Sequence, residues 1–308
     1  MKNNYKYIKA GSVLSAILLL SGCGGGGGSS AATQPNFTNW SSISKPSQVN
    51  LEGVSTDSSY VFDGSKVTST TSHGVDLTAA ANVTYRADNT ISKISFSTDN
   101  SGVTFDEDAT DVIGNTGNTV YGYDLAGTKF LLAADPLTIG WNYQTFGIWE
   151  TGRGTGSGTA GAISAGAVTL GSSIPTKDSA TYNGHFGGVL SDFDGDDFLT
   201  RGSVVVGVNF ADKELTFNTT STQTLSPVAS NPTWSTATAY NITPAANGTK
   251  LTYSDATNSF TGALKDGNNF TGTATGRFYG PNAEELGGVF NLSGSGLNNH
   301  AGAFGAKK

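Results

Sequence analysis

Two stretches near the C-terminus decide the fold. One is GTATGRFYGPNAEELGGVF at residues 272–290, and the other is GAFGAKK at residues 302–308. Phe278 and Phe290 are spaced as aromatic anchors on two adjacent strands. Pro281, which follows a glycine, cannot continue a hydrogen-bonded ladder, and the glycine pair 287–288 allows a tight entry into the next strand. The longer stretch therefore predicts two antiparallel strands with a short connection.

Alternation of apolar and polar residues continues upstream. Tyr182, Phe186 and Leu190 would share one face of a strand, as would Val204, Val206 and Val208 of the next. Glycine occupies 42 positions and charged residues only 13%, and beyond the N-terminal leader no stretch has a helical period. These features predict an all-β chain with about eight strands at the spacing of an up-and-down barrel. Periodicity leaves a β-sandwich open. A porin-type barrel is disfavoured because the alternate positions are Thr, Ser, Asn and Gly.

The 272–290 stretch and the ending at 302–308 resemble the barrel end of the transferrin-binding protein B-like surface lipoproteins. The segment YQTFGIWE at residues 143–150 is similar to the first barrel strand of that family. The resemblance covers roughly residues 141–308. It implies an N-terminal handle-like β domain at 36–138, followed by an eight-stranded antiparallel β-barrel at 139–308. Within the handle region, Asp88-Asn89 and Ala126-Gly127 are predicted hairpin turns, and residues 102–111 are predicted to be irregular.

The same resemblance implies function and partners. It implies a non-catalytic protein, displayed on the cell surface, that binds a host or environmental protein or an iron source. Relatives include haemoglobin- and complement factor H-binding lipoproteins. A TonB-dependent receptor and an outer-membrane lipoprotein translocator are the implied partners in the envelope. A structural or adhesion role and haem binding are the alternatives.

The first residues form a secretory leader. Lys2, Lys6 and Lys9 precede a short apolar run, and the leader ends in Leu-Ser-Gly before Cys23. This ending resembles a lipobox, which predicts a signal peptide at 1–22 and acylation of Cys23, palmitate included. Residues 23–35 are rich in Gly and Ser and predict a flexible tether. We therefore expect a lipid anchor in the outer membrane and exposure at the cell surface.

Charge and cysteine content exclude other classes. The chain has a formal net charge of −7, and removal of the leader lysines would make it more acidic. An acidic surface argues against nucleic-acid binding. Cys23 is the only cysteine, so no intramolecular disulfide can form and the fold must rest on its core.

Two polar loops are the candidate ligand-binding sites, because loops on a rigid scaffold commonly carry recognition. The first contains Gly152, Arg153 and Gly154. The second contains Asp192, Asp194 and Asp196, which resemble the start of a calcium loop. A calcium loop needs Gly at its sixth position and Glu at its twelfth, and the residues here are Asp and Ser. A solvated hairpin turn is the favoured interpretation.

No catalytic or metal site is predicted. Glu284 and Glu285 are adjacent, so their carboxylates should point in different directions rather than act as an acid–base pair. His73, His185 and His300 are too far apart for a metal-ligand motif, and His185 is expected to face solvent. A His or Tyr ligand to haem remains open. Without a recognisable nucleophile–base set, the chain is predicted not to be an enzyme.

Overall fold

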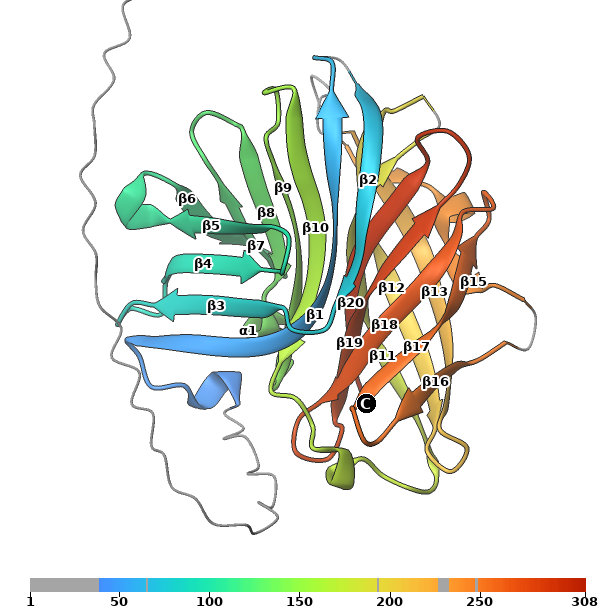
Figure 1. The fold of residues 1–308 in the computed structure, drawn as a ribbon. Helices are drawn as coiled ribbons and strands as arrows, with labels where there is room; N and C mark the ends of the chain where they lie inside the picture. The colour runs from blue at the N-terminus through green and yellow to red at the C-terminus, as the bar shows by residue number, and fades with distance from the viewer. Residues whose placement is uncertain (1–38, 65, 193, 227–232, 247–248) are drawn as a thin grey trace, which may run out of the picture. The chain divides into compact units, whose positions relative to one another are not determined.

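The computed structural model describes residues 39–64, 66–192, 194–226, 233–246 and 249–308. Most of them belong to the strands of two antiparallel sheets (Figure 1). The first sheet has the order β5-β4-β3-β1-β10-β9-β8-β7-β6, with β2 paired to β1. Its strands are β1 (Ser47–Phe62), β2 (Val67–Asp76), β3 (Ala80–Tyr85), β4 (Ile91–Ser97), β5 (Gly102–Asp106), β6 (Val112–Thr116), β7 (Thr119–Tyr123), β8 (Lys129–Ala134), β9 (Gln144–Thr151) and β10 (Ser157–Gly166).

The second sheet closes into a barrel. Its main strands are β11 (Ser179–Ser191), β12 (Asp197–Asn209), β13 (Glu214–Leu225), β16 (Leu251–Ser254), β17 (Ser259–Asp266), β18 (Thr271–Tyr279), β19 (Glu285–Ser293) and β20 (Asn299–Lys307). Pairing of β12 with β13 joins the two ends of this eight-stranded path. Two short strands, β14 (Ser235–Thr236) and β15 (Ile242–Pro244), pair with β13 and β17. The predicted all-β fold and eight-stranded antiparallel barrel are therefore confirmed.

Short helical segments connect the strands. They are η1 (Trp40–Ser42), η2 (Glu107–Ala109), α1 (Pro136–Ile139), η3 (Gly171–Ser173) and η4 (Thr238–Tyr240). Helix α1 begins at Pro136, where the missing N–H costs no hydrogen bond, and the Asp135 side chain accepts the Leu137 amide. No helix in the described ranges combines the length and the apolar character needed to cross a membrane.

Aromatic rings fill the barrel, and glycines on neighbouring strands make room for them. Phe278 is fully buried and contacts the rings of Tyr182, Phe210, Tyr253 and Phe260. A Cβ at Gly276 would lie 2.3 Å from the Phe260 ring. In the first sheet, a Cβ at Gly161 would lie 2.2 Å from the indole of the buried Trp149. Glycine inside these strands therefore serves the close approach of rings.

The two sheets contact each other through an apolar cluster and several polar links. The cluster contains Val54, Ala134, Trp141, Phe146, Ile148 and Ala162 from the N-terminal half and Leu199, Val289 and Ala303 from the barrel. Both carboxylate oxygens of the buried Glu285 accept backbone amides, from Asn142 at 2.6 Å and Tyr143 at 3.0 Å. The Gln144 side chain donates to the Ala306 carbonyl at 2.8 Å. All the described residues fall within one compact unit, Pro35–Lys308.

The structure corrects the assignment of residues 143–150. The predicted first barrel strand is β9, which pairs with β8 and β10 in the first sheet. The barrel instead begins at β11, so the change of sheet falls after β10 and does not coincide with the predicted domain boundary at 138/139. Residues 102–111, expected to be irregular, form β5 and η2. The leader, Cys23 and the tether lie outside the described residues.

Candidate functional site

The two predicted loops lie far apart in sequence, yet the structure brings them to the same end of the molecule. Residues 152–156 connect β9 to β10, and residues 192–196 connect β11 to β12. The β1–β2 hairpin lies between them, because Phe62 donates its amide to Gly156 at 3.0 Å and Val67 donates to Gly195 at 3.0 Å. We call these three connections the hairpin cluster. In Figure 1 the ends of β1, β9 and β10 lie together at the top of the view.

Each turn is held by its own hydrogen bonds. Oδ1 of Asp192 accepts the amides of Asp194 at 3.0 Å and Asp196 at 2.9 Å. Asp194 and Asp196 are exposed, as expected for a solvated hairpin turn. In the other loop, Gly152 and Gly154 have positive φ angles of 78° and 69°, which glycine adopts without strain. The described residues contain no group of three His, Cys, Asp or Glu side chains that could hold a metal ion.

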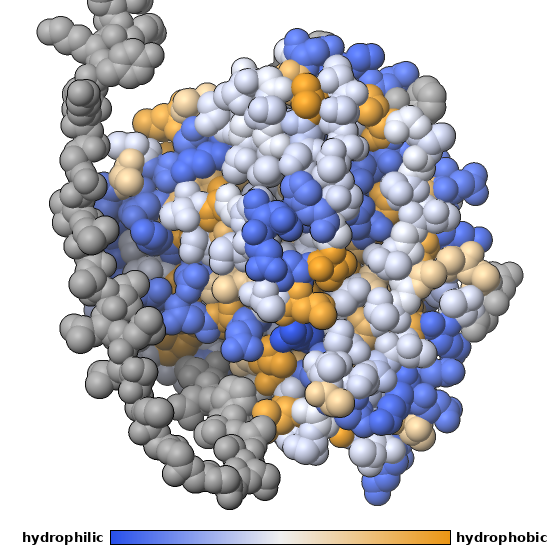
Figure 2. Space-filling model, viewed as in Figure 1, coloured by the Kyte–Doolittle hydropathy of each residue, from blue (hydrophilic) through white to orange (hydrophobic). Residues whose placement is uncertain are grey.

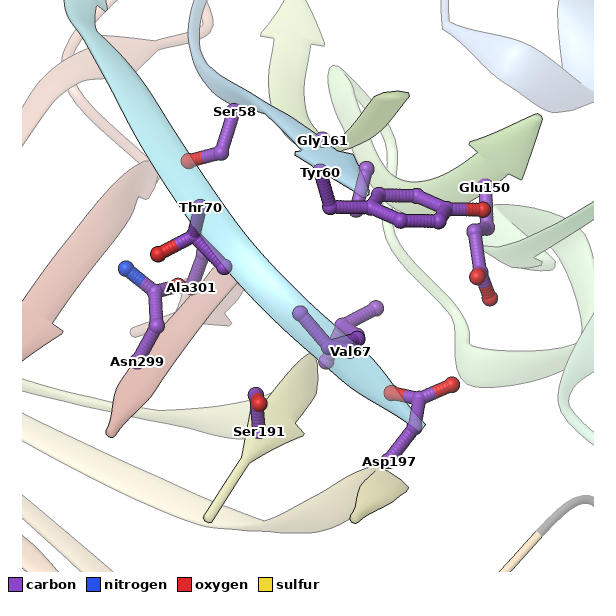
Figure 3. Close-up of a pocket in the computed structure, with 12 residues that line it drawn as sticks. Ser58, Tyr60, Val67, Thr70, Glu150, Gly161, Ser191, Asp197, Asn299 and Ala301 are labelled. Atoms are coloured by element: carbon purple, nitrogen blue, oxygen red, sulfur yellow. The ribbon is translucent and has the colours of Figure 1, made fainter. Parts of the chain in front are cut away.

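Beneath the hairpin cluster lies a small cavity of about 40 Å³ between the two sheets. Figure 3 shows the Tyr60 ring with its hydroxyl beside Glu150, while Asp197 lies on the barrel side of the same cavity. The Tyr60 hydroxyl donates to the Thr151 carbonyl at 2.8 Å. Arg153 lies 3.5 Å from Glu150 and over the ring of Phe130. Arg153, a predicted site residue, therefore ties the β9–β10 turn to a buried carboxyl group.

The cavity favours neutral carboxyl groups. Burial and the nearby Glu150 raise the pKa of Asp197 to about 7. Burial also raises the pKa of Glu150, although Arg153 opposes that shift. Burial raises the pKa of Tyr60 as well, so its phenol stays protonated. Two carboxyl groups share one arginine here, so the pair takes up a proton more readily than either group would in water.

The other singled-out residues do not converge. His185 is exposed, as predicted, whereas His300 is fully buried in the barrel and its pKa is lowered by burial to about 3. Glu284 accepts the Asn282 amide at 2.8 Å, while the adjacent Glu285 points to the segment just before β9. The two carboxylates accept hydrogen bonds from different groups, in agreement with the prediction that they point in different directions.

A nucleophile–base arrangement that the sequence did not reveal lies across β1 and β2. His73 Nε2 is 3.0 Å from the Ser59 hydroxyl, and His73 Nδ1 is 2.8 Å from Asp57 Oδ1. Asp57 is buried, and its other oxygen accepts the Thr98 hydroxyl at 2.7 Å. Through these contacts Asp57 fixes the orientation of the His73 ring, which in turn faces the Ser59 hydroxyl.

Comparison with known families is clearest for the barrel. Residues 174–308 match the model described as the C-lobe and N-lobe beta barrels of Tf-binding protein B. The matched segment begins just before β11 and contains all eight barrel strands. Over residues 174–308 the chain is similar to the barrel lobes of the transferrin-binding protein B family. This confirms the resemblance noted from the sequence, and members of the family are binding proteins rather than enzymes.

Solved structures of transferrin-binding protein B and a related protein are also similar to this chain. A variant of the vaccine antigen Transferrin Binding Protein B from Haemophilus parasuis Hp5 is 14% identical, with a TM-score of 0.44 over 80% of this chain and 59% of that one. Isotype 1 of the same protein from serogroup B Neisseria meningitidis is 17% identical, with a TM-score of 0.43 over 74% of this chain and 49% of that one. The N-lobe domain of Lactoferrin Binding Protein B of Moraxella bovis is 15% identical, with a TM-score of 0.38 over 84% of this chain and 99% of that one. The chain thus spans about half to three fifths of the two transferrin-binding proteins. A comparison with curated sequences finds no match.

Proposed function

We propose that this protein is an outer-membrane lipoprotein, displayed on the cell surface, that binds a soluble host or environmental protein through the hairpin cluster. The similarity of residues 174–308 to the barrel lobes of the transferrin-binding protein B family carries the proposal. Transferrin and lactoferrin are the first candidates, because similar structures are of proteins named for binding them.

The hairpin cluster has properties suited to recognition. Its loops extend from strands of two sheets, so the scaffold beneath is rigid while the loop sequence is free to vary. At the top of Figure 2, polar and apolar residues lie side by side, a mixture typical of transient protein interfaces. Thr155 is exposed at the tip of the β9–β10 turn. We infer that a partner contacts this tip and the neighbouring 192–196 turn.

The test immobilises the full-length mature protein and measures its binding of transferrin, lactoferrin and haemoglobin. A second assay identifies the proteins that it captures from whole serum. Thr155→Arg should weaken capture at least tenfold, since a bulky cation at the tip blocks close contact. Ala211→Arg is the matched control. It adds the same charge at an exposed turn at the other end of β12. Absence of any partner at micromolar protein, or equal loss in both variants, would count against the proposal and favour a structural or adhesion role.

Three further experiments address the surface display, the lipid anchor and the envelope partners. Protease treatment of intact cells should digest the protein, whereas digestion only after lysis would indicate that it faces the periplasm. Cys23→Ala should release the protein from the membrane fraction. Retention of the receptor or translocator in a cross-linked complex on intact cells would support the envelope partners that the family suggests.

A further inference from the structure

A second cavity, away from the hairpin cluster, has a volume of about 890 Å³. It is a groove between β8, β9 and α1 on one side and β11–β13 on the other. Its size falls within the roughly 300–1,000 Å³ range of small-molecule pockets. The walls are largely apolar, and the main contributors are Leu132, Phe146, Ile148, Leu199, Leu225 and Trp234.

The described lining of the groove holds a cationic side chain and no carboxylate. In a chain of net charge −7, the described lining contains Arg201 and His185 but no Asp or Glu. The Arg201 guanidinium lies 4.1 Å from the centre of the Trp234 ring, and its Nε donates to Gln223 at 2.9 Å. These contacts fix the plane of the guanidinium. Its terminal nitrogens make no hydrogen bond or ion pair within the described part of the chain.

Arg201 is exposed to solvent, but its contacts with Trp234 and Gln223 hold it in one orientation at the edge of the groove. Partial burial lowers the pKa of its guanidinium. A planar guanidinium held on an aromatic ring presents two parallel N–H donors, the geometry that carboxylates match. Next to it lies the largely apolar wall of the groove. The groove therefore combines an anion receptor with a surface for a hydrocarbon.

We propose that this groove binds an amphipathic carboxylate, with the acyl chain against the Phe146–Leu199 wall and the carboxylate on Arg201. This site is independent of the protein-binding function proposed above. Two features of binding follow. Affinity should rise by roughly fourfold with each methylene until the groove is filled. The alcohol of equal chain length should bind more weakly, because it cannot form a charged pair with Arg201.

Calorimetric titration of the full mature chain with laurate, decanoate and 1-dodecanol tests the assignment. We expect one saturable site, with laurate tighter than decanoate. Arg201→Gln should weaken laurate at least tenfold and leave dodecanol within twofold. Arg86→Gln is the matched control, because Arg86 pairs with Glu107 and Asp108 on the first sheet. It should change neither the affinity for laurate nor the affinity for dodecanol. Leu225→Trp, which fills the groove, should abolish both. Circular dichroism should verify that each variant is folded.

Three outcomes would overturn the proposal. The first is no saturable binding of laurate. The second is binding of several laurate molecules per chain with an affinity that neither Arg201→Gln nor Leu225→Trp changes, which would indicate surface adsorption. The third is a Soret shift with haemin that is lost in His185→Ala while laurate does not compete, which would assign the groove to a porphyrin instead.

Discussion

The interior of the barrel and the junction between the two sheets are built from different chemistry. The barrel core is a set of aromatic and aliphatic side chains around Phe278. The junction has an apolar cluster too, but it also buries Glu150, Glu285 and the polar lining around Asp197. Packing around Phe278 dominates the first region, although His300 and Asp266 are also buried there. In the second region, the buried Glu285 links the two sheets through hydrogen bonds to backbone amides. Because the pKa of Asp197 is raised to about 7, we expect changes near neutral pH to act on the junction beneath the hairpin cluster more than on the barrel core.

Removal of a barrel ring should have the largest effect on stability. Phe278→Ala leaves a cavity among four aromatic rings and should lower the free energy of unfolding by about 3–5 kcal/mol. Urea denaturation measures the change. Val205→Ala, on the outer side of β12 where the side chain is exposed, should cost within about 0.5 kcal/mol. Similar losses in the two variants would contradict a core centred on Phe278.

Loss of the polar link at the junction should cost less. Glu285→Ala leaves the amides of Asn142 and Tyr143 without their acceptor, and a buried orphan donor costs about 1–3 kcal/mol. The adjacent Glu284→Ala serves as the control, because its partner Asn282 is exposed and can bond to water. If Glu284→Ala were as destabilising as Glu285→Ala in the same denaturation assay, the link would not hold the sheets together.

The stability of the junction should depend on pH. A carboxyl group whose folded pKa is raised binds its proton more tightly in the folded state, so stability is lost as the pH rises from 3.8 to about 7, the folded pKa of Asp197. Denaturation midpoints at pH 5 and pH 8 should differ less in Asp197→Asn than in the parent. Asp194→Asn, an exposed neighbour in the same turn, should keep the parent's dependence. An unchanged slope in Asp197→Asn would place the titrating group elsewhere.

A surface ion pair on the barrel should have the smallest effect. Lys213 and Asp255 form a partly exposed pair between the β12–β13 turn and the end of β16. Exposed pairs contribute about 0.2–1 kcal/mol, so Lys213→Ala should change stability by no more than that. Thermal unfolding in low and high salt should show a small difference that salt removes. A loss above 2 kcal/mol would mean that this pair is structural.

The sequence predicted which segments form strands better than it predicted which strands pair. Alternating apolar residues located β11 and β12, and Asp88-Asn89 marked a hairpin at which Asn89 adopts a φ of 73°. Alternation shows which side chains are buried but not which strand lies alongside, so β9 was assigned to the barrel although it pairs with β8 and β10.

The site was predictable only in part. The sequence proposed both candidate loops, and their role in binding stays a prediction. Their convergence depends on the β1–β2 hairpin, which carried no functional signal. Asp197 belonged to a run of acidic residues that suggested solvent, yet it begins β12 and faces the cavity. The contacts of His73 depend on an irregularity in β1–β2 pairing, since Asp57 faces Gly74 and Ser58 faces Ser72. An irregularity of this kind leaves no trace in residue spacing.

Site-specific photo-cross-linking tests the central claim most directly. A benzoylphenylalanine is placed at Thr155 in the hairpin cluster or at Ala211 at the other end of the barrel, and intact cells are irradiated in serum. Our account predicts a covalent adduct with a serum protein from position 155 and none from position 211. Equal adducts from both positions, or an adduct from position 211 alone, would contradict recognition by the hairpin cluster.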